Sequence, residues 1–278
     1  MAYTERYVSV AGAGAHNGTS AANAWTLAEG LANAVAAERV NVIFDAGGYS
    51  LGADAISGPG NIVDFIVFRG YESTIGDLEG QGKSADTPLD TTNFPVITLT
   101  GTLTLSNFSV LQNMYFTGAL SGALVGSGTP DNNSIISCKI LNTQNNANAR
   151  AFVGDNNVTL INSDFRCTGA AHNIVVDFDT DGTISGCRFQ GVDADALVAT
   201  NYADVEKSTF IGNSKVGIGL KFLSAERYTV KNNTFYSLAK CVEMPNVAQT
   251  RPSIFIDNHA TDSGVWLESL YAGTADNA

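Results

Sequence analysis

Five aspartates within a short stretch have the residue type and spacing that best suit metal or sugar chemistry: Asp177, Asp179, Asp181, Asp193 and Asp195. Carboxylate oxygens are preferred Ca²⁺ ligands, and the first three aspartates are spaced as at the start of an EF-hand loop. The twelfth position of that loop, however, is Arg188, where a bidentate glutamate is required. We therefore favour solvated residues at a strand end and turn, and keep a glycan-binding or Ca²⁺-binding strip as the alternative.

No further side chain completes a catalytic site around these aspartates. Lys221 would lie two coils beyond Asp177, about 10 Å away, which is too far for a direct acid/base pair. The sequence has no Gly-x-Ser-x-Gly element, P-loop or nicotinamide fingerprint, and Gly12-Ala-Gly14 lacks the context of a Rossmann fold. We accordingly assign no catalytic residue, no resident metal and no cofactor.

The charge of the chain bears on its partners. The 278 residues carry a formal net charge of -12, from 27 acidic and 15 basic residues. Such a charge repels phosphate backbones, so we expect no nucleic-acid partner. The first residues lack the basic start and apolar stretch of a signal peptide, and no apolar run is long enough to cross a bilayer. We expect synthesis in a host cytoplasm and no membrane association.

A short strand signature recurs through the second half of the chain. Each occurrence opens on an aliphatic residue and closes on a large apolar one: 110–115, 135–140, 160–165, 184–189, 205–210 and 230–235. The closing positions are separated by 25, 25, 24, 21 and 25 residues. That step is the length of one β-solenoid coil, so opening and closing residues would stack on their equivalents about 4.8 Å above and below.

Two further columns support this register. Apolar residues alternate with outward ones later in each coil, as in Ile174 and Val176 or Leu197 and Ala199. The position two before the closing residue is small or amide-bearing, and we expect it to form a hydrogen-bonded corner column: Asn113, Cys138, Ser163, Cys187, Ser208 and Asn233. Cys138 and Cys187 would stand about 9.6 Å apart, beyond the reach of a disulfide. All four cysteines are predicted to be free thiols.

The N-terminal segment precedes this repeat. A strand over 6–10 and a loop over 11–24 are followed by an amphipathic helix, which begins with the capping-box pair Thr26 and Glu29. Its apolar face is Leu27, Ala28, Leu31 and Val35, and Glu38 and Arg39 end it. We expect this helix to cover the open end of the core. Residues 40–45, 62–69 and 95–104 are predicted strands, and 70–93 a long loop.

The chain is therefore predicted to be one all-β domain, a right-handed parallel β-helix (solenoid) with a short N-terminal capping helix. Residues 1–39 form the N-terminal strand, loop and cap helix, 40–262 the coils, and 263–278 a C-terminal cap or tail. In that last segment Trp266, Leu267, Leu270 and Tyr271 would cover the final coil or contact another subunit.

Several short elements carry a family resemblance: Tyr7-Val8-Ser9, Asn17-Gly18-Thr19-Ser20, Ala24-Trp25-Thr26-Leu27 and coils that end in Asn-x-Phe-like triplets. In this combination the chain is similar to the pectate-lyase-like right-handed β-helix superfamily, most of all to its phage virion-associated members. The resemblance covers nearly the whole chain and implies a scaffold. Because that superfamily holds polysaccharide lyases, glycoside hydrolases, tailspikes and other virion proteins, it does not select a function.

The catalytic motifs of these relatives are missing. Polygalacturonase-like members carry Asn-Thr-Asp, Asp-Asp, Gly-His-Gly and Arg-Ile-Lys, and none of these occurs here. His16, His172 and His259 have no glycine framing, and the surroundings of Arg251-Pro252 do not match the pectate-lyase motif.

Three functions remain open. The first is a structural virion protein of a phage, either a head decoration protein or a fibre/tailspike-like β-helix, without catalysis. It would be localised in the virion and form a homotrimer. Its partners would be other virion proteins or a surface glycan. The second is a polysaccharide lyase or glycoside hydrolase acting on an acidic or bacterial surface glycan. The third is a non-catalytic glycan-binding module that uses Tyr202, Tyr228 and Tyr236.

Overall fold

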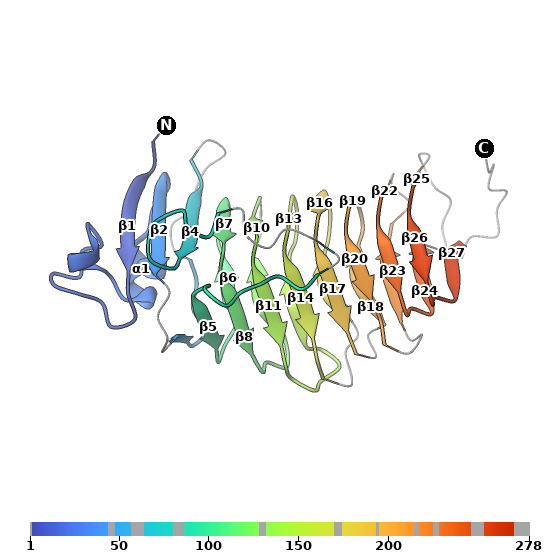
Figure 1. Cartoon of the computed structure of the whole chain (residues 1–278), viewed down its shortest axis with the longest axis horizontal. Coiled ribbons are helices and arrows are strands. Elements are labelled where there is room, and N and C mark those ends of the chain that lie inside the picture. Colours follow the sequence, from blue (N-terminus) through green and yellow to red (C-terminus); the bar gives the residue numbers. More distant parts are fainter. Residues whose placement is uncertain are drawn as a thin grey trace.

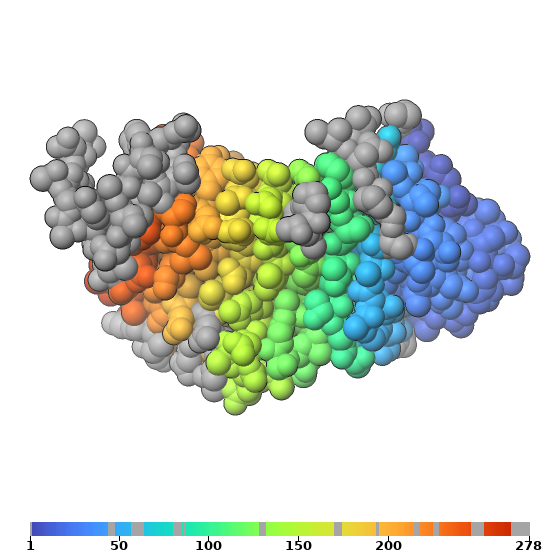
Figure 2. All heavy atoms as spheres, turned by 180° about the vertical axis from the view of Figure 1, so that it is seen from behind, coloured from blue at the N-terminus to red at the C-terminus, as the bar shows by residue number. Residues whose placement is uncertain are grey.

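The chain folds as a right-handed parallel β-helix whose coils follow one another along the long axis, with β1 and β27 at opposite ends (Figure 1). Seen from behind, the colours succeed one another in bands, because each coil stacks on the one before it (Figure 2). The computed structural model describes residues 2–43, 48–56, 64–79, 85, 87–127, 132–169, 174–192, 195–213, 217–224, 228–245 and 253–269. The all-β solenoid predicted from the repeat is confirmed.

Three parallel sheets form the walls, and from β7 onward each coil contributes one strand to each sheet. Sheet A contains β1 (Thr4–Val8), β2 (Glu38–Ile43), β4 (Ile66–Tyr71), β7 (Ser109–Gln112), β10 (Ser134–Ile136), β13 (Thr159–Ile161), β16 (Gly182–Ser185), β19 (Ala203–Glu206), β22 (Thr229–Lys231) and β25 (Ile254–Ile256). Sheet B contains β3 (Tyr49–Leu51), β5 (Val96–Leu99), β8 (Tyr115–Gly118), β11 (Lys139–Asn142), β14 (Asp164–Cys167), β17 (Arg188–Gly191), β20 (Thr209–Ile211), β23 (Thr234–Tyr236) and β26 (His259–Thr261). Sheet C contains β6 (Leu103–Leu105), β9 (Ala123–Ser127), β12 (Arg150–Val153), β15 (Ile174–Phe178), β18 (Ala196–Thr200), β21 (Ile218–Phe222), β24 (Lys240–Met244) and β27 (Val265–Ser269).

The closing column that the repeat predicted is present in the core, whereas the second column was partly wrong. Val175 and Val176 are both buried, and Val176 pairs with Val198 rather than with Leu197 or Ala199. The closing phenylalanines of successive coils are register partners and fully buried: Phe165, Phe189, Phe210 and Phe235. Their rings stack with centroid separations of 5.4, 5.1 and 4.8 Å. Offset aromatic stacking adds about 0.5–1.5 kcal/mol per pair to the burial of the rings, so this column is a main source of cohesion between coils.

The register of the first predicted segment was wrong by one residue. Leu111 pairs with Ile135 and Phe116 pairs with Ile140, so these two residues, rather than Val110 and Tyr115, enter the core columns. The sequence offers apolar residues at both neighbouring positions, and a slip of one residue reverses which face a side chain occupies. Tyr115 therefore lies on the outer face of sheet B.

The corner between sheets A and B is made by a column of residues in the left-handed region. Their φ values lie between 49° and 64°: Asn113, Ser137, Asn162, Gly186, Lys207, Asn232 and Asp257. From Asn113 to Asn232, each backbone N–H along this column donates to a carbonyl of the next coil, as from Asn162 to the carbonyl of Ser185 at 2.9 Å. Asparagine and glycine tolerate this conformation best, which explains their frequency here.

The predicted hydrogen-bonded corner column is the position that follows. The N–H of Cys187 donates to Ser208 Oγ at 3.1 Å, and the N–H of Ser208 donates to Asn233 Oδ1 at 2.9 Å. The ladder therefore runs from coil to coil as expected. Asn113 does not belong to it, because the one-residue slip puts Met114 in the place equivalent to Cys138.

All four cysteines are free and buried, as predicted. Burial in an apolar interior disfavours the thiolate and raises the pKa of Cys187 to about 12, and the same cause raises the pKa of Cys167 to about 12. These thiols pack as small apolar side chains.

The N-terminal end of the core is covered by α1 (Leu27–Asn33), which follows the short 3₁₀ turn η1 (Ala21–Asn23). The capping box is present, with Thr26 Oγ1 accepting from the N–H of Glu29 and Glu29 Oε2 accepting from the N–H of Thr26. Leu27 and Leu31 are buried against the first coils. The capping role predicted for this helix is confirmed.

The predicted length and apolar face of the helix were partly wrong. Ala28 is exposed, and Val35 lies beyond the end of α1 with 53% of its surface exposed. Glu38 and Arg39 belong to β2 instead. The Glu38 carboxylate accepts a hydrogen bond from the N–H of Val35 at 3.0 Å and pairs with Arg6 at 2.6 Å, which fixes the chain for the strand that follows.

The long loop predicted over 70–93 begins after β4, which extends to Tyr71. Its described residues form no strand after Tyr71, but they build a small core of their own from Leu78, Leu89 and Phe94, with Tyr115 packed against it. The loop is therefore fixed to the outside of sheet B rather than thrown free of it.

The C-terminal end is less covered. The final coil is complete, since β26 and β27 follow β25, so coil structure reaches Ser269 within the segment predicted as a cap or tail. Trp266 packs edge-on against Phe235 with 5.3 Å between ring centroids, whereas Leu267 is 40% exposed. Leu270 and Tyr271 lie outside the described residues. No helix in the described ranges is long and apolar enough to cross a membrane.

Candidate functional site

The predicted acidic strip begins on sheet C. Asp177 projects from β15 with its side chain 33% exposed, and its Oδ2 lies 3.5 Å from Arg150 Nε on β12, one coil earlier. Val153 and Ala199 are register neighbours of Asp177, and Lys221 follows Ala199 one coil further on. The predicted separation of two coils between Asp177 and Lys221 is therefore confirmed.

The other aspartates take part in turns. Asp179 is exposed and its Oδ1 accepts a hydrogen bond from Asn201 Nδ2. Asp181 occupies a left-handed corner position, with φ of 55°, between sheets C and A. Asp195 is exposed, and its carbonyl accepts from the N–H of Ile218 at 3.0 Å. Asp193 lies outside the described residues.

The described members of the strip, Asp177, Asp179, Asp181 and Asp195, form no metal-binding group with one another. Across the described ranges, no group of three or more His, Cys, Asp or Glu side chains is placed to hold a metal ion. Asp177 has a cationic partner and Asp179 an amide partner instead, which accounts for both in structural terms. The glycan-binding or Ca²⁺-binding role of the strip remains a prediction.

Sheet C also carries a compact charged cluster that the sequence reasoning did not identify. Glu243 on β24 has only 7% of its side chain exposed and lies between two lysines. Lys240 Nζ is 2.7 Å from Glu243 Oε2, and Lys221 Nζ is 3.4 Å from Glu243 Oε1. The two ammonium groups compensate a carboxylate that would be costly to bury alone.

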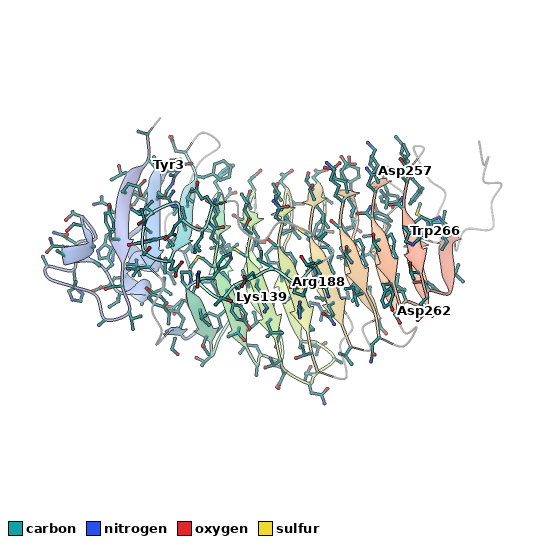
Figure 3. All side chains as sticks on the ribbon, viewed as in Figure 1. Tyr3, Lys139, Arg188, Asp257, Asp262 and Trp266 are labelled. Atoms are coloured by element: carbon teal, nitrogen blue, oxygen red, sulfur yellow. The ribbon has the colours of Figure 1, made fainter. Side chains whose placement is uncertain are left out.

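A second such cluster lies on the outer face of sheet B. Asp164 is 1% exposed and accepts two hydrogen bonds of 2.8 Å from Arg166, which lies two residues further along the same strand, β14. Lys139 is the register neighbour of Asp164 on β11 and lies over the Tyr115 ring at 4.6 Å. Burial, with a smaller contribution from Arg166, lowers the pKa of Lys139. Figure 3 shows Lys139 and Arg188 on this same face.

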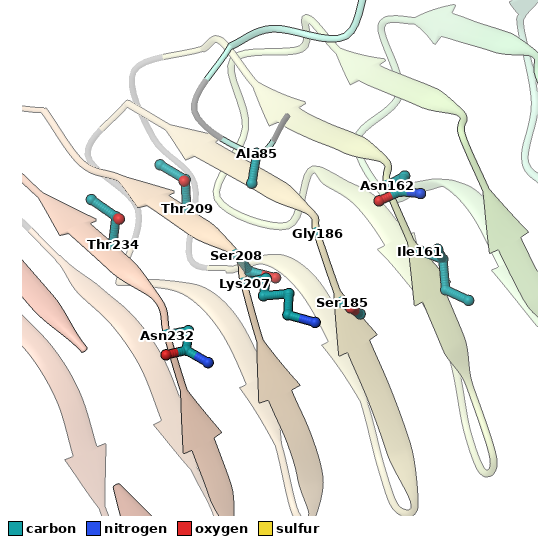
Figure 4. Close-up of a pocket in the computed structure, with 10 residues that line it drawn as sticks. All are labelled: Ala85, Ile161, Asn162, Ser185, Gly186, Lys207, Ser208, Thr209, Asn232 and Thr234. Carbon is teal, nitrogen blue, oxygen red and sulfur yellow. The ribbon is translucent and has the colours of Figure 1, made fainter. Parts of the chain in front are cut away.

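A groove of about 480 Å³ runs along the corner between sheets A and B. Figure 4 shows its floor and walls: Ala85 from the long loop, Ile161, Asn162, Ser185, Gly186, Lys207, Ser208, Thr209, Asn232 and Thr234. Four successive coils contribute the residues other than Ala85, from β13 to the start of β23. The long loop that follows β4 contributes Ala85 to this groove, opposite the corner column of the later coils.

This groove was not predicted, although a local signal was present. Asn162, Gly186, Lys207 and Asn232 each stand one position before the corner ladder. Asparagine and glycine that recur at the coil interval indicate left-handed turns. The position of Ala85, by contrast, depends on a loop with no periodicity.

The tyrosines proposed for glycan stacking are differently placed. Tyr228 is fully buried and stacks on Phe222 with 3.7 Å between centroids, so it is not an exposed platform. Tyr236 is 47% exposed on β23, and Tyr202 is partly buried. The three side chains lie on different parts of the coil and form no shared surface.

Comparisons with known proteins agree with this architecture. The crystal structure of pectate lyase Pel9A is similar over 95% of this chain and 80% of that chain, with a TM-score of 0.50 and 11% identity. At so low an identity the likeness shows the fold alone, which is that of a pectate-lyase-type β-helix.

The sequence family is shown by a separate match. The model of the family described as "Adenovirus EB1 55K protein / large t-antigen" matches residues 103–263, more than half of the chain, and the chain belongs to this family. The matched region starts at β6 and extends just beyond β26, so it spans the regular coils. No curated protein sequence matches the chain.

Proposed function

We propose that the protein is a structural component of a virion, in which the solenoid itself is the working part and assembles as a homotrimer. The observation that carries this proposal is the position of the exposed apolar side chains. Five of the eight large ones in the described residues lie in the last coils: Leu223, Tyr236, Ile256, Val265 and Leu267. Exposed apolar surface of this kind is typical of a contact with another polypeptide.

The charged residues support the same proposal. Asp164, Asp177 and Glu243 are each paired with a basic side chain of the same solenoid. Among the described residues, the carboxyl groups with a clearly shifted pKa are Glu29, Asp77 and Asp90, and in each the pKa is lowered, whereas a general acid needs it raised. A viral origin also fits the family name.

Light scattering on the purified chain tests the assembly. We expect a particle of three chains of 29.1 kDa, and we expect the double variant Ile256→Lys/Leu267→Lys to be monomeric. Val35→Lys, which alters an equally exposed residue near the N-terminus, is the matched control and should remain trimeric. A strict monomer at high concentration would contradict the proposal, as would a gene neighbourhood of sugar-transport genes without capsid or portal genes.

A second candidate is cleavage of an acidic or bacterial surface polysaccharide, favoured by the charged residues that sheet C collects on one face. Carboxylates and cations lie within neighbouring coils here: Asp177 is paired with Arg150, and Glu243 is paired with Lys221 and Lys240. If this function holds, Asp177→Ala/Asp179→Ala should abolish turnover on a responsive polysaccharide, whereas Asp204→Ala, an exposed change on sheet A, should not. Unchanged activity in the double variant would exclude this site.

A further inference from the structure

The corner groove between sheets A and B has features of a binding site rather than of a turn surface alone. It is shaped by two independent parts of the chain, the corner column and Ala85 of the long loop. It spans four coils, which corresponds to three rises of about 4.8 Å, or about 14 Å along the solenoid axis. A ligand bound there would lie parallel to that axis.

Several polar side chains in the groove have no partner among the residues that the structure describes. The amides of Asn162 and Asn232 and the hydroxyl of Thr234 make no side-chain hydrogen bond within the described part of the chain. The backbone N–H groups of the two asparagines are already used between coils. These side chains therefore offer donors and acceptors to a ligand at repeated positions.

The charge of the groove limits the class of ligand. Lys207 is the one basic residue among the described lining residues, and its Nζ lies 3.6 Å from Glu206 Oε1. Glu206 also accepts a hydrogen bond from Ser185 Oγ at 3.1 Å. The lysine charge is thus largely balanced, and the net charge of -12 repels polyanions.

The lining contains no aromatic ring among its described residues, so recognition would depend on hydrogen bonds rather than on stacking. An extended ligand that is uncharged and carries hydroxyl groups along its length fits these properties. We propose that the corner groove binds a neutral oligosaccharide through Asn162, Asn232 and Thr234, with the Lys207 side chain, which crosses toward Ser185 in Figure 4, closing one side. This proposal is independent of the oligomeric state.

The decisive variant is Asn162→Gly/Asn232→Gly. Both residues have a positive φ, 49° and 55°, which glycine adopts without strain, so the change removes two amides and leaves the corner intact. Asn157→Gly is the matched control, because Asn157 has a φ of 53° at a different corner and does not line the groove. Thermal unfolding of each variant verifies that the solenoid is retained.

Titration calorimetry would use maltohexaose, cellohexaose and chitohexaose as neutral probes and an oligogalacturonate of equal length as the acidic probe. We expect at least one neutral probe to bind, the double variant to lose about tenfold or more in affinity, and Asn157→Gly to bind as the natural chain does. Asp177→Ala/Asp179→Ala should also bind normally. The proposal is overturned if no neutral probe binds, if the acidic probe binds more tightly, or if the aspartate variant rather than the asparagine variant loses binding.

Discussion

In the coils from β14 to β23, cohesion comes from repetition: one phenylalanine per coil stacks on the next at about the spacing of the strands. Around β2 and β4 the corresponding role on the outer face is taken by a single charged network. Arg69, with 4% of its side chain exposed, donates to Asn41 Oδ1 at 2.8 Å and to Glu79 Oε1 at 3.0 Å. Repeated apolar contacts tolerate variation between coils, whereas the network depends on each of its members.

The two regions also differ in how they treat loops. The Arg69 network joins β4 to Glu79 in the long loop, and Asp77 fixes the start of that loop by accepting hydrogen bonds from three backbone N–H groups. In the later coils two residues join sheets A and B, as Asn162 and Ser163 do, and the first of them is in the left-handed region. The same corner therefore holds a long insertion between β4 and β5 and a tight turn in the later coils.

The largest effect concerns thiol reactivity, because all four cysteines lie in the coils from β10 onward and none lies around β2 and β4. Burial raises the pKa of Cys187 from 9.0 to about 12, which lowers its thiolate fraction at pH 8 about a thousandfold. We expect a colourimetric thiol reagent to detect almost no reaction in the native protein and four equivalents in guanidinium chloride. Rapid labelling of Cys187 in the native state would show that the later coils open readily.

The phenylalanine column can be broken directly. Phe189→Ala removes a ring with stacked neighbours on both sides and should lower the free energy of unfolding by about 3–5 kcal/mol in a guanidinium titration. Tyr236→Ala, at a 47% exposed position on β23 of the same sheet, should change it by about 0.5 kcal/mol or less. A loss below about 1 kcal/mol for Phe189→Ala would mean that the column is not a main source of cohesion.

The charged network of the early coils should respond less strongly. Arg69→Met keeps most of the apolar stem but leaves Asn41 and Glu79 without their donor, so we expect a loss of about 2 kcal/mol. Limited proteolysis should then cut the long loop faster than in the natural chain. Lys207→Met, an exposed change in the later coils, is the control and should have little effect on either measurement. Equal results for both variants would remove the contrast between the two regions.

The smallest effect is a pH dependence at the N-terminal cap. Hydrogen bonds from the Thr26 N–H, and then from His16 and the Thr26 hydroxyl, lower the pKa of Glu29 below its ordinary value of 4.5. Because the folded-state pKa is the lower one, this contribution to stability is complete above about pH 4.5 and is lost as the pH falls through the lowered pKa. Glu29→Gln should therefore make the unfolding midpoint less dependent on pH in the acid range. Part of that dependence should remain, because the pKa values of Asp77 and Asp90 are also lowered. An unchanged slope would show that the cap does not titrate with folding.

The columns of the later coils were predictable because each coil repeats the same burial pattern. Ile184 and Phe189, the free cysteines and the capping box of Thr26 could all be assigned from spacing. The errors fell where the pattern offered two choices. Val110-Leu111 and Tyr115-Phe116 each place apolar residues side by side, so spacing alone did not decide which one faces inward.

The candidate sites were less predictable. The acidic strip was selected by residue type, yet the partners of Asp177 and Asp179 come from other coils, through Arg150 and Asn201. Glu243 was not identified from the sequence, since Lys221 becomes its second cationic partner only once β21 and β24 are neighbours. Charge pairing across strands depends on register, and register is a property of the folded chain.

The amino-acid sequence by itself determined the solenoid, its coil length and its hydrogen-bonded corner column, because these follow from local residue preferences repeated at a fixed interval. Only the tertiary structure decided where the long loop comes to rest. The loop is held against Tyr115 by the side chains of Leu78, Leu89 and Phe94. It also places Ala85 beside the corner column, three or more coils beyond β4, the strand that the loop follows. The groove is a contact between segments distant in sequence, and no local preference encodes such a contact.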